Sequence, residues 1–424
     1  MPRHAVMNFL KLALPLYLLF FIIFLGCTDD GSPEPVVPPV EDNPSGMLYV
    51  NIVGQYMKLD ASNDSVYWRA ETLYLFGSYR NPMTFNSDYF YHGNYTSMTC
   101  YSAVSGLPAW SVSWPAFSDA ISYQDPAFND SLIFFSSPTS VWDHGSLYCK
   151  NKKTGAPKWQ VPIDSGDVDI NFNGIPLVNG DKVITLTRNQ NNEKHLTAFS
   201  IRNGAWLWST PVGDGTASKF WLVDDRIYSA YGPEALCFDA SNGKLLWETD
   251  MNTPVAAWTY NFFDADKLIA VKVLNNTNYK ILQIQKSNGA IISTKDLTIP
   301  TTYAPQTQMI APLGCSYDDD NLYLASFNDI DSLDIFSYDM TGMSQKWKKR
   351  FANSYFTGEP PILTDKYLVF PINDQYNAHD PAHSNMIFLD HSGKLVKKVP
   401  FNSTYVDGFV YKEDGIIYPQ PPRF

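Results

Sequence analysis

The feature that most constrains this chain is a short hairpin that recurs at intervals of 39 to 53 residues. In its clearest copy, Cys237–Trp247, a strand leads into the turn Ser241-Asn242-Gly243 and a second strand ends in Trp. Asn and Gly tolerate the positive φ angles that a tight hairpin turn needs. Related turns fall at Asp64, Gly106, Gly155, Gly204, Gly289, Gly342 and Gly393. A period of this length is typical of stacked or radial repeats.

Two residue types recur at fixed places in the hairpin. A Trp stands four residues after the turn in five copies (Trp68, Trp110, Trp159, Trp208 and Trp247); Trp347 stands five after Gly342, and the Gly289 and Gly393 copies lack it. We interpret these Trp residues as apolar plugs between neighbouring repeats. Cys100, Cys149 and Cys237 each lie six residues before their turn glycine, and we expect buried, unpaired thiols because equivalent sites are too far apart to bridge.

A second kind of hairpin, with an acidic or polar turn, alternates with the first. Its turns are marked by Asp88, Asp130, Asp181, Asp225, Asp266, Asp320, Asp365 and Asp414. The alternation predicts a four-stranded antiparallel meander, A-B-C-D, repeated eight times, which is an all-β, eight-bladed β-propeller. The chain begins with a C–D hairpin and ends with an A–B hairpin. We therefore expect N- and C-terminal strands to close the ring in one blade, with Ile416–Tyr418 pairing near Tyr49–Leu59.

The N-terminus reads as a targeting segment. Arg3 and Lys11 precede an apolar run that is too short to span a bilayer comfortably, and the run ends in Phe24-Leu25-Gly26-Cys27. This resembles the lipobox of bacterial lipoproteins and implies acylation of Cys27, with either Met1 or Met7 as the start. The expected organisation is a signal peptide over 1–27, a Pro-rich acidic tether over 28–46 and a propeller over 47–424.

Two acidic residues follow Cys27, at Asp29 and Asp30. They resemble the surface-export signal of lipoproteins from the Bacteroidetes, and a solvated spacer is the alternative interpretation. We expect a protein anchored by lipid to the outer membrane, on the periplasmic or the cell-surface side.

The hairpin also resembles the Ala-x-Asp-x-x-x-Gly-Lys-x-x-Trp motif of the PQQ-type propeller repeat. Asp239, Gly243, Lys244 and Trp247 match, and Cys237 replaces the Ala. That family includes quinoprotein dehydrogenases and the propeller lipoprotein of the outer-membrane barrel-assembly machinery. A quinoprotein would imply bound pyrroloquinoline quinone, calcium, an acidic base and a disulfide between adjacent cysteines. The chain has no Cys-Cys pair and few long insertions, so we expect no cofactor.

The remaining candidates for chemistry are few. His379, Asp380 and His383 share one polar loop, but Pro381 breaks any helix there and no third ligand is evident, so a solvated loop is favoured over a metal site. A net charge of −12 argues against a nucleic-acid partner, which would need a basic face.

Recognition is expected on the face that carries the longer B–C and D–A connections. The aromatic candidates there are Trp114, Trp142, Trp258, Tyr260, Tyr303, Tyr355 and Tyr376. We expect a monomeric, non-enzymatic propeller that binds or scaffolds protein partners, with outer-membrane assembly as one version of that role. A surface glycan-binding lipoprotein is the alternative, and a quinoprotein-type enzyme comes third.

Overall fold

The computed structural model describes residues 45–52, 55–71, 83–86, 88–93, 97–113, 126–136, 146–161, 175–188, 193–213, 220–253, 258–275, 277–299, 314–318, 320–329, 332–352, 354–356, 361–373, 384–401, 406–414 and 416–418. The chain divides into two compact units, Met1–Asp42 and Asn43–Phe424, and every described residue belongs to the second. These residues form strands and turns, with no helix among them. A search of this part of the chain for a helix able to cross a membrane accordingly finds none.

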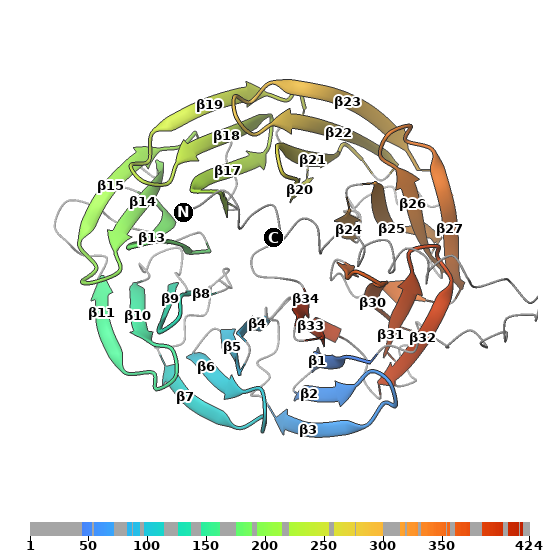
Figure 1. Cartoon of the computed structure of the whole chain (residues 1–424), viewed down its shortest axis with the longest axis horizontal. Coiled ribbons are helices and arrows are strands. Elements are labelled where there is room, and N and C mark those ends of the chain that lie inside the picture. The colour runs from blue at the N-terminus through green and yellow to red at the C-terminus, as the bar shows by residue number, and fades with distance from the viewer. Residues whose placement is uncertain are drawn as a thin grey trace, which may run out of the picture. The chain divides into compact units, whose positions relative to one another are not determined.

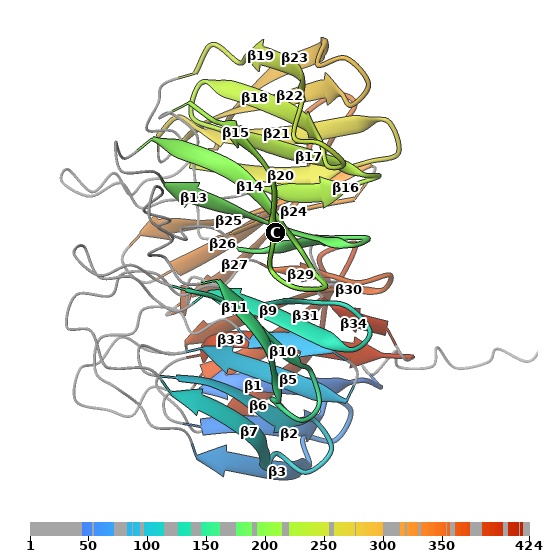
Figure 2. The same cartoon turned by 90° about the vertical axis from the view of Figure 1, so that its left-hand side faces the viewer.

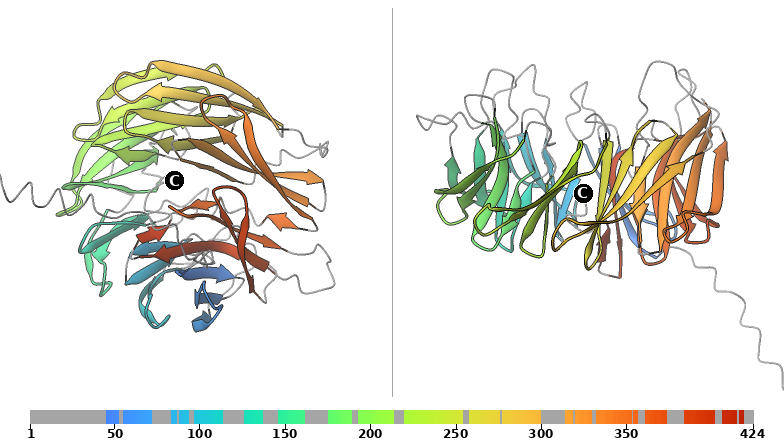
Figure 3. Two further views of the ribbon diagram at one scale, coloured as in Figure 1. Left: turned by 45° about the vertical axis from the view of Figure 1, so that its right-hand side comes forward. Right: turned by 90° about the horizontal axis from the view of Figure 1, so that it is seen from above.

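The strands form eight antiparallel sheets arranged in a ring, and this confirms the predicted eight-bladed β-propeller. We number the sheets as blades 1 to 8 in chain order. In Figure 1 the first strand of each of blades 2 to 7 lies nearest the centre of the ring and the fourth lies at its outside. Because each blade is a meander, its A–B and C–D turns lie on one side of the ring, which we call the turn face. The B–C and D–A connections lie on the other side, the loop face, and Figures 2 and 3 show the tight turns gathered together.

The strands of each blade are as follows. Blade 1 contains β1 (Met47–Ile52), β2 (Gln55–Asp60), β3 (Val66–Glu71), β33 (Val406–Glu413) and β34 (Ile416–Tyr418). Blade 2 contains β4 (Met83–Asn86), β5 (Tyr89–Gly93), β6 (Ser97–Ser102) and β7 (Pro108–Ser113), and blade 3 contains β8 (Ala127–Phe128), β9 (Leu132–Ser136), β10 (Leu147–Asn151) and β11 (Pro157–Val161). Blade 4 contains β12 (Leu177–Asn179), β13 (Lys182–Arg188), β14 (Lys194–Ser200) and β15 (Trp206–Pro211).

The second half of the ring repeats the pattern. Blade 5 contains β16 (Trp221–Val223), β17 (Arg226–Tyr231), β18 (Glu234–Asp239) and β19 (Leu245–Asp250), and blade 6 contains β20 (Trp258–Phe263), β21 (Lys267–Val273), β22 (Asn278–Gln285) and β23 (Ile291–Thr298). Blade 7 contains β24 (Gly314–Tyr317), β25 (Asn321–Asp329), β26 (Ser332–Asp339) and β27 (Gln345–Ala352). In blade 8, two short strands, β28 (Tyr355–Phe356) and β29 (Ile362–Leu363), both pair with β30 (Tyr367–Asn373), which is followed by β31 (Ser384–Asp390) and β32 (Leu395–Phe401).

The C–D turns form because their side chains bond to their own backbone. In blade 5, Asp239 Oδ1 accepts a hydrogen bond from the Ser241 amide at 2.8 Å. Hydrogen bonds from the Ser241 side chain and from this amide lower the pKa of the Asp239 carboxyl. Gly243 then takes a φ of +75°, which L side chains rarely adopt. In blade 7 the left-handed residue is Met343, at φ +54°, rather than the predicted Gly342. Trp347 therefore stands four residues after the turn residue, as in the other copies.

The ring is closed within blade 1, as predicted, but by a different pair of strands. β33 pairs with β1, for example Val50 with Phe409, whereas the expected partner, Ile416–Tyr418, pairs only with β33. Blade 1 thus has five strands, in the order β3-β2-β1-β33-β34. The prediction was wrong in this detail because β1 supplies the second strand of the blade, and β34 is left as an additional strand beyond β33.

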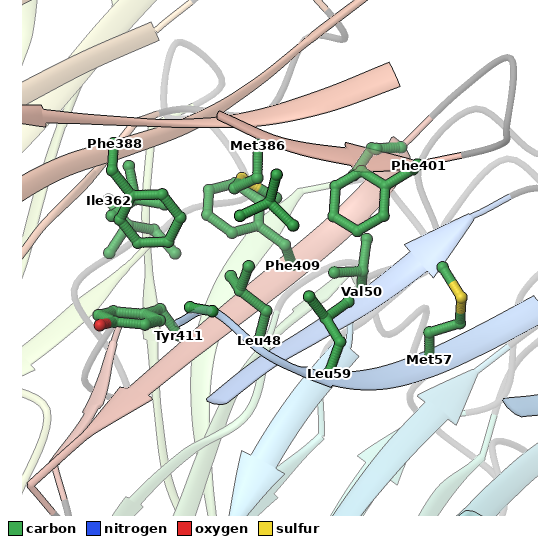
Figure 4. Packing of buried hydrophobic residues seen from close by; sticks show 14 of the residues in the cluster. Leu48, Val50, Met57, Leu59, Ile362, Met386, Phe388, Phe401, Phe409 and Tyr411 are labelled. Carbon is green, nitrogen blue, oxygen red and sulfur yellow. The ribbon is translucent and has the colours of Figure 1, made fainter. Parts of the chain in front are cut away.

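Eight apolar clusters fill the eight joints between neighbouring blades. The joint between blades 8 and 1, shown in Figure 4, brings Leu48 and Val50 of β1 and Phe409 of β33 against Met386 and Phe388 of β31. The alternating side chains of each strand thereby serve two joints, one on each face of the sheet. The predicted thiols belong to these cores: Cys100, Cys149 and Cys237 lie on third strands and are buried and free, which confirms that expectation.

The recurring Trp residues pack across the outer edge of six of the eight joints. Trp247 of blade 5 lies against Gly289 in the C–D turn of blade 6, so closely that a Cβ on that glycine would come within 2.6 Å of the ring. Its Nε1 donates to the Lys286 carbonyl at 3.0 Å. In blade 6, which lacks the Trp, Lys295 Nζ donates to the Met340 carbonyl at 3.2 Å across the next joint. In blade 8, Lys397 Nζ donates to the Ser62 carbonyl at 2.6 Å, so a lysine replaces the indole as the donor.

Candidate binding surfaces

The loop face carries connections of very different lengths. β17 and β18 are joined by Gly232 and Pro233 alone, whereas β11 and β12 are separated by residues 162–176 and β23 and β24 by 299–313. The turn face has only tight connections. A rigid ring with one face of unequal connections is the arrangement in which binding residues are usually placed.

The structure describes few of the aromatic candidates predicted for this face. Trp258 and Tyr355 are the first residues of β20 and β28. Tyr260 is half-buried in β20 and packs against the apolar cluster between blades 6 and 7. Trp114, Trp142, Tyr303 and Tyr376 lie outside the described residues, as do the metal candidates His379, Asp380 and His383. Within the described ranges, no three His, Cys, Asp or Glu side chains come together in a way that could hold a metal ion.

Sequence reasoning missed a buried lysine at the loop end of the joint between blades 5 and 6. Lys272 of β21 is 0% exposed, and its Nζ donates to the Gly232 carbonyl and, at 2.8 Å, to Thr259 Oγ1. Thr253 Oγ1 donates to the same Gly232 carbonyl at 3.1 Å. Burial lowers the pKa of Lys272 to about 7, because the charged ammonium loses its hydration. The signal was available in the sequence, since Lys272 shares the inward face of β21 with Leu268 and Ala270.

The other perturbed groups are explained by packing. Burial raises the pKa of Cys237 to about 11 and those of Cys100 and Cys149 to about 12, so these thiols are protonated and poor nucleophiles at neutral pH. Burial lowers the pKa of His92 to about 4, and its ring lies edge-on to Tyr56 with centroids 5.3 Å apart. None of these groups is paired with a second reactive group in an open cleft.

One ion cluster within a single blade has a buried carboxylate and two partly exposed cations. The Asp334 carboxylate, 1% exposed, lies on β26 and receives a bidentate pair of hydrogen bonds from Arg350 at 2.8 and 3.0 Å. Lys348 Nζ approaches the same carboxylate at 2.7 Å. Both cations come from the adjacent outer strand, β27, and they compensate the buried charge. This cluster holds β26 and β27 together and leaves no free carboxylate for catalysis.

Three solved structures are similar to the chain, and the two with TM-scores above 0.5 support the fold. BamB from Moraxella catarrhalis is 16% identical, with 67% of this chain and 80% of that chain covered and a TM-score of 0.47. Dihydro-heme d1 dehydrogenase NirN is 11% identical, with 88% and 77% covered and a TM-score of 0.59. Quinohemoprotein alcohol dehydrogenase ADHIIG from Pseudomonas putida HK5 is 12% identical, with 79% and 68% covered and a TM-score of 0.51. At these identities the likeness concerns the fold alone.

No curated protein sequence is significantly similar to the chain. A family model, however, matches it three times in overlapping windows, at residues 38–190, 95–254 and 192–292. These windows cover more than half of the chain and include strands β1 to β3 of blade 1, blades 2 to 5 and most of blade 6. The chain therefore belongs to the β-propeller family described as outer membrane protein assembly factor BamB.

Proposed function

We propose that this protein is a lipid-anchored envelope lipoprotein whose propeller is a non-catalytic scaffold for protein partners in outer-membrane assembly. Membership of the family described as an outer membrane protein assembly factor is the observation that carries the proposal. The anchor is Cys27, within the lipobox-like Leu25-Gly26-Cys27, and residues 28–46 are the tether.

The loop face is the proposed partner surface. Ordering a chain segment costs conformational entropy for every residue. The turn-face connections are short, so this entropy cost is low. The loop-face connections at 162–176, 299–313 and 374–383 are longer, so their cost is higher. Long connections on a rigid support are kept more often for recognition than for stability. The candidates Trp114, Trp142, Trp258, Tyr303 and Tyr376 belong to or border the longer connections of this face, whereas Tyr355 follows the short connection 353–354.

The chemistry of the described residues supports a binding role over catalysis. The buried thiols of Cys100, Cys149 and Cys237 are protonated at neutral pH, and Lys272 has neutral hydrogen-bond acceptors and no exposed surface. A catalytic group would need access to a substrate as well as a perturbed pKa. Lys272 has a perturbed pKa but no access to a substrate.

The test is capture of partners from native envelope by the full chain, with alanine at Trp114, Trp142 and Trp258 together. We expect loss of capture with an unchanged thermal midpoint, because these side chains then serve the partner and not the core. The matched control is Trp206→Ala, which removes a 45% exposed indole from the turn face and should leave capture intact. An early thermal transition in the triple variant, with capture retained by its folded fraction, would show that the loop face is not the partner surface. Binding of polysaccharide in place of protein would establish the glycan-binding alternative.

A further inference from the structure

Exposed apolar side chains gather at one end of the outer strands. On blades 4, 5 and 6 the first two residues of the outer strand are Trp206 and Leu207, Leu245 and Leu246, and Ile291 and Ile292, all 40% to 46% exposed. Blades 1, 2 and 8 carry exposed apolar side chains at the same C–D hairpins, including Tyr67 at 58%. Every exposed large apolar side chain of the described residues lies there, except Ile416, which follows the last A–B turn. We call these outer-strand starts, together with the exposed apolar residues Val104 and Leu107 in the C–D turn of blade 2, the apolar rim of the turn face.

The hairpin itself does not require apolar residues at the rim. The Trp or Lys side chain that donates a hydrogen bond across the joint lies further along the outer strand. The turn is stabilised by hydrogen bonds between its own side chains and backbone. Blades 3 and 7 carry Lys158 and Lys346 at the second outer-strand position, both exposed, without any change in the strand pairing. Polar residues are thus accepted there by the fold. Strand pairing therefore does not require the apolar residues on the other six blades, although Trp206 also lies edge-on to Phe199 of its own blade, with ring centroids 6.2 Å apart.

The outer-strand starts also differ from the rest of the chain in charge. The first two residues of all eight outer strands include no Asp or Glu, although the chain has 43 acidic residues and a net charge of −12. The two charged residues that do occur are lysines, whose long stems can lie on apolar surface while the ammonium reaches polar headgroups. The A–B turns of the same face carry exposed carboxylates, such as Asp181 and Asp224, so only the outer-strand starts present apolar side chains and lysine stems without acidic neighbours in the same strand positions. Apolar side chains flanked by lysines suit the interfacial region of a phospholipid surface.

The chain enters the propeller at this same face. Gly46 accepts a hydrogen bond on its carbonyl from the Ala61 amide, in the C–D turn of blade 1, at 2.8 Å. Its own amide donates to Tyr411 Oη at 3.2 Å, and Ser45 Oγ donates to Glu413 beside the last A–B turn at 3.4 Å. The segment that precedes Ser45 therefore leaves from between the two turns of blade 1. A Pro-rich segment from Cys27 to Ser45 would span at most about 56 Å, at ~3.1 Å per residue.

We propose that the turn face is the membrane-facing side of the propeller and that its apolar rim rests on the lipid bilayer. The inference rests on the proposed anchor at Cys27, because a tether leaving the turn face keeps that face within reach of the lipid. Docking of the rim leaves the loop face turned away from the bilayer, where a partner can reach it. The rim thus sets the orientation of the scaffold, which a flexible tether alone could not do.

Trp206 provides an intrinsic probe for the test. The purified full chain is reconstituted into liposomes of phosphatidylethanolamine and phosphatidylglycerol, with and without brominated acyl chains, which quench indole fluorescence on contact. We expect quenching in the brominated liposomes, and we expect Trp206→Phe to lose the quenched share of the emission. The variant L246E/I292E, which keeps Trp206, should lose that share too, because two carboxylates cannot rest in the acyl region.

The matched control places the same charges at the opposite ends of outer strands. S113E/T298E alters two exposed residues at the ends of β7 and β23 that border the loop face, and it should be quenched like the wild type. Equal quenching in the wild type and L246E/I292E, or none in the wild type, would overturn rim docking. Sedimentation showing a dimer that L246E/I292E dissolves, without lipid quenching, would assign the rim to a second copy instead. Mass spectrometry of the N-terminal peptide tests acylation of Cys27 separately, and an unacylated chain is mixed with the same liposomes and scored in the same way.

Discussion

Replacing Lys272 with methionine should stabilise the protein at neutral pH and reverse its effect in alkali. The side chain is 0% exposed in the joint between blades 5 and 6, and its pKa is lowered from 10.5 to about 7 by burial. The folded state therefore favours the neutral amine, whereas the unfolded chain keeps the ammonium up to its ordinary pKa. Because the unfolded state binds the extra proton between pH 7 and 10.5, stability from this group rises with pH across that window.

The size of the effect follows from the shift. At 1.36 kcal/mol per pKa unit, keeping Lys272 in the fold costs about 4 kcal/mol at pH 7 and about 2 kcal/mol at pH 9. Methionine removes that cost and fills a similar volume, but it cannot donate to Gly232 or Thr259. Losing two hydrogen bonds costs roughly 2 kcal/mol in total. The variant should then be about 2 kcal/mol more stable at pH 7, equal near pH 9 and less stable above it.

Urea unfolding followed by Trp fluorescence between pH 7 and 10 measures this crossing. The difference between variant and wild type isolates Lys272, since other groups titrate in both proteins. Lys267→Met is the matched control: it lies on the same strand, its side chain is 34% exposed, and its Nζ is 3.8 Å from Asp264. That pair should contribute no more than about 1 kcal/mol, without a crossing. Parallel stability curves for Lys272→Met and wild type would refute the reasoning.

Three further outcomes are expected from the fold. Gly243→Ala should lower the free energy of unfolding in denaturant by about 3 kcal/mol, because φ is +75° and the new Cβ would lie 2.4 Å from Trp208. Gly180→Ala, at φ +56° with open space around it, should lower it by only about 1 kcal/mol. Cys100, Cys149, Cys237 and Cys315 should resist maleimide in the native protein and react in urea, because all four are buried; labelling of the native protein measured by mass spectrometry would contradict this. Deleting residues 410–424 should open the ring and make blade 1 sensitive to protease, whereas a chain that ends at Tyr418 keeps every described strand and should stay resistant.

Local chemistry made the repeat predictable. Each C–D turn needs one left-handed residue and an Asx or Ser cap, and these signals lie within a few residues of one another, as in Asp239–Lys244. The same locality explains the misassigned turn in blade 7. Gly342 stood where a glycine was expected, but Met343 takes the positive φ, and the spacing to Trp347 was the stronger signal. With this register Trp347 lies against Gly393 of blade 8, as the Trp four residues after the turn does at the other joints that contain one.

The candidate surfaces were less predictable from sequence. Aromatic residues such as Tyr260 look alike whether they serve a partner or a joint, and here Tyr260 packs half-buried against the joint of blades 6 and 7. Lys272 gave a usable signal, because a lysine on the inward face of an apolar strand must be neutralised or paired. The apolar rim required the structure, since exposure at the start of an outer strand depends on how far the neighbouring blade covers it.

The seam that closes the ring explains why a noncovalent closure can be stable. The two chain ends meet inside a sheet, where β33 pairs with β1, and not at a joint between blades. Val50 and Phe409 on one face of this pair belong to the joint with blade 8, while Tyr49 and Val410 on the other face belong to the joint with blade 2. Opening the seam would therefore expose two strand edges and disrupt two apolar cores at once. Because β1 and β33 belong to both cores, separating the two strands disrupts both cores together, and the closure is cooperative. The stability of the whole ring therefore depends on the pairing of β1 with β33.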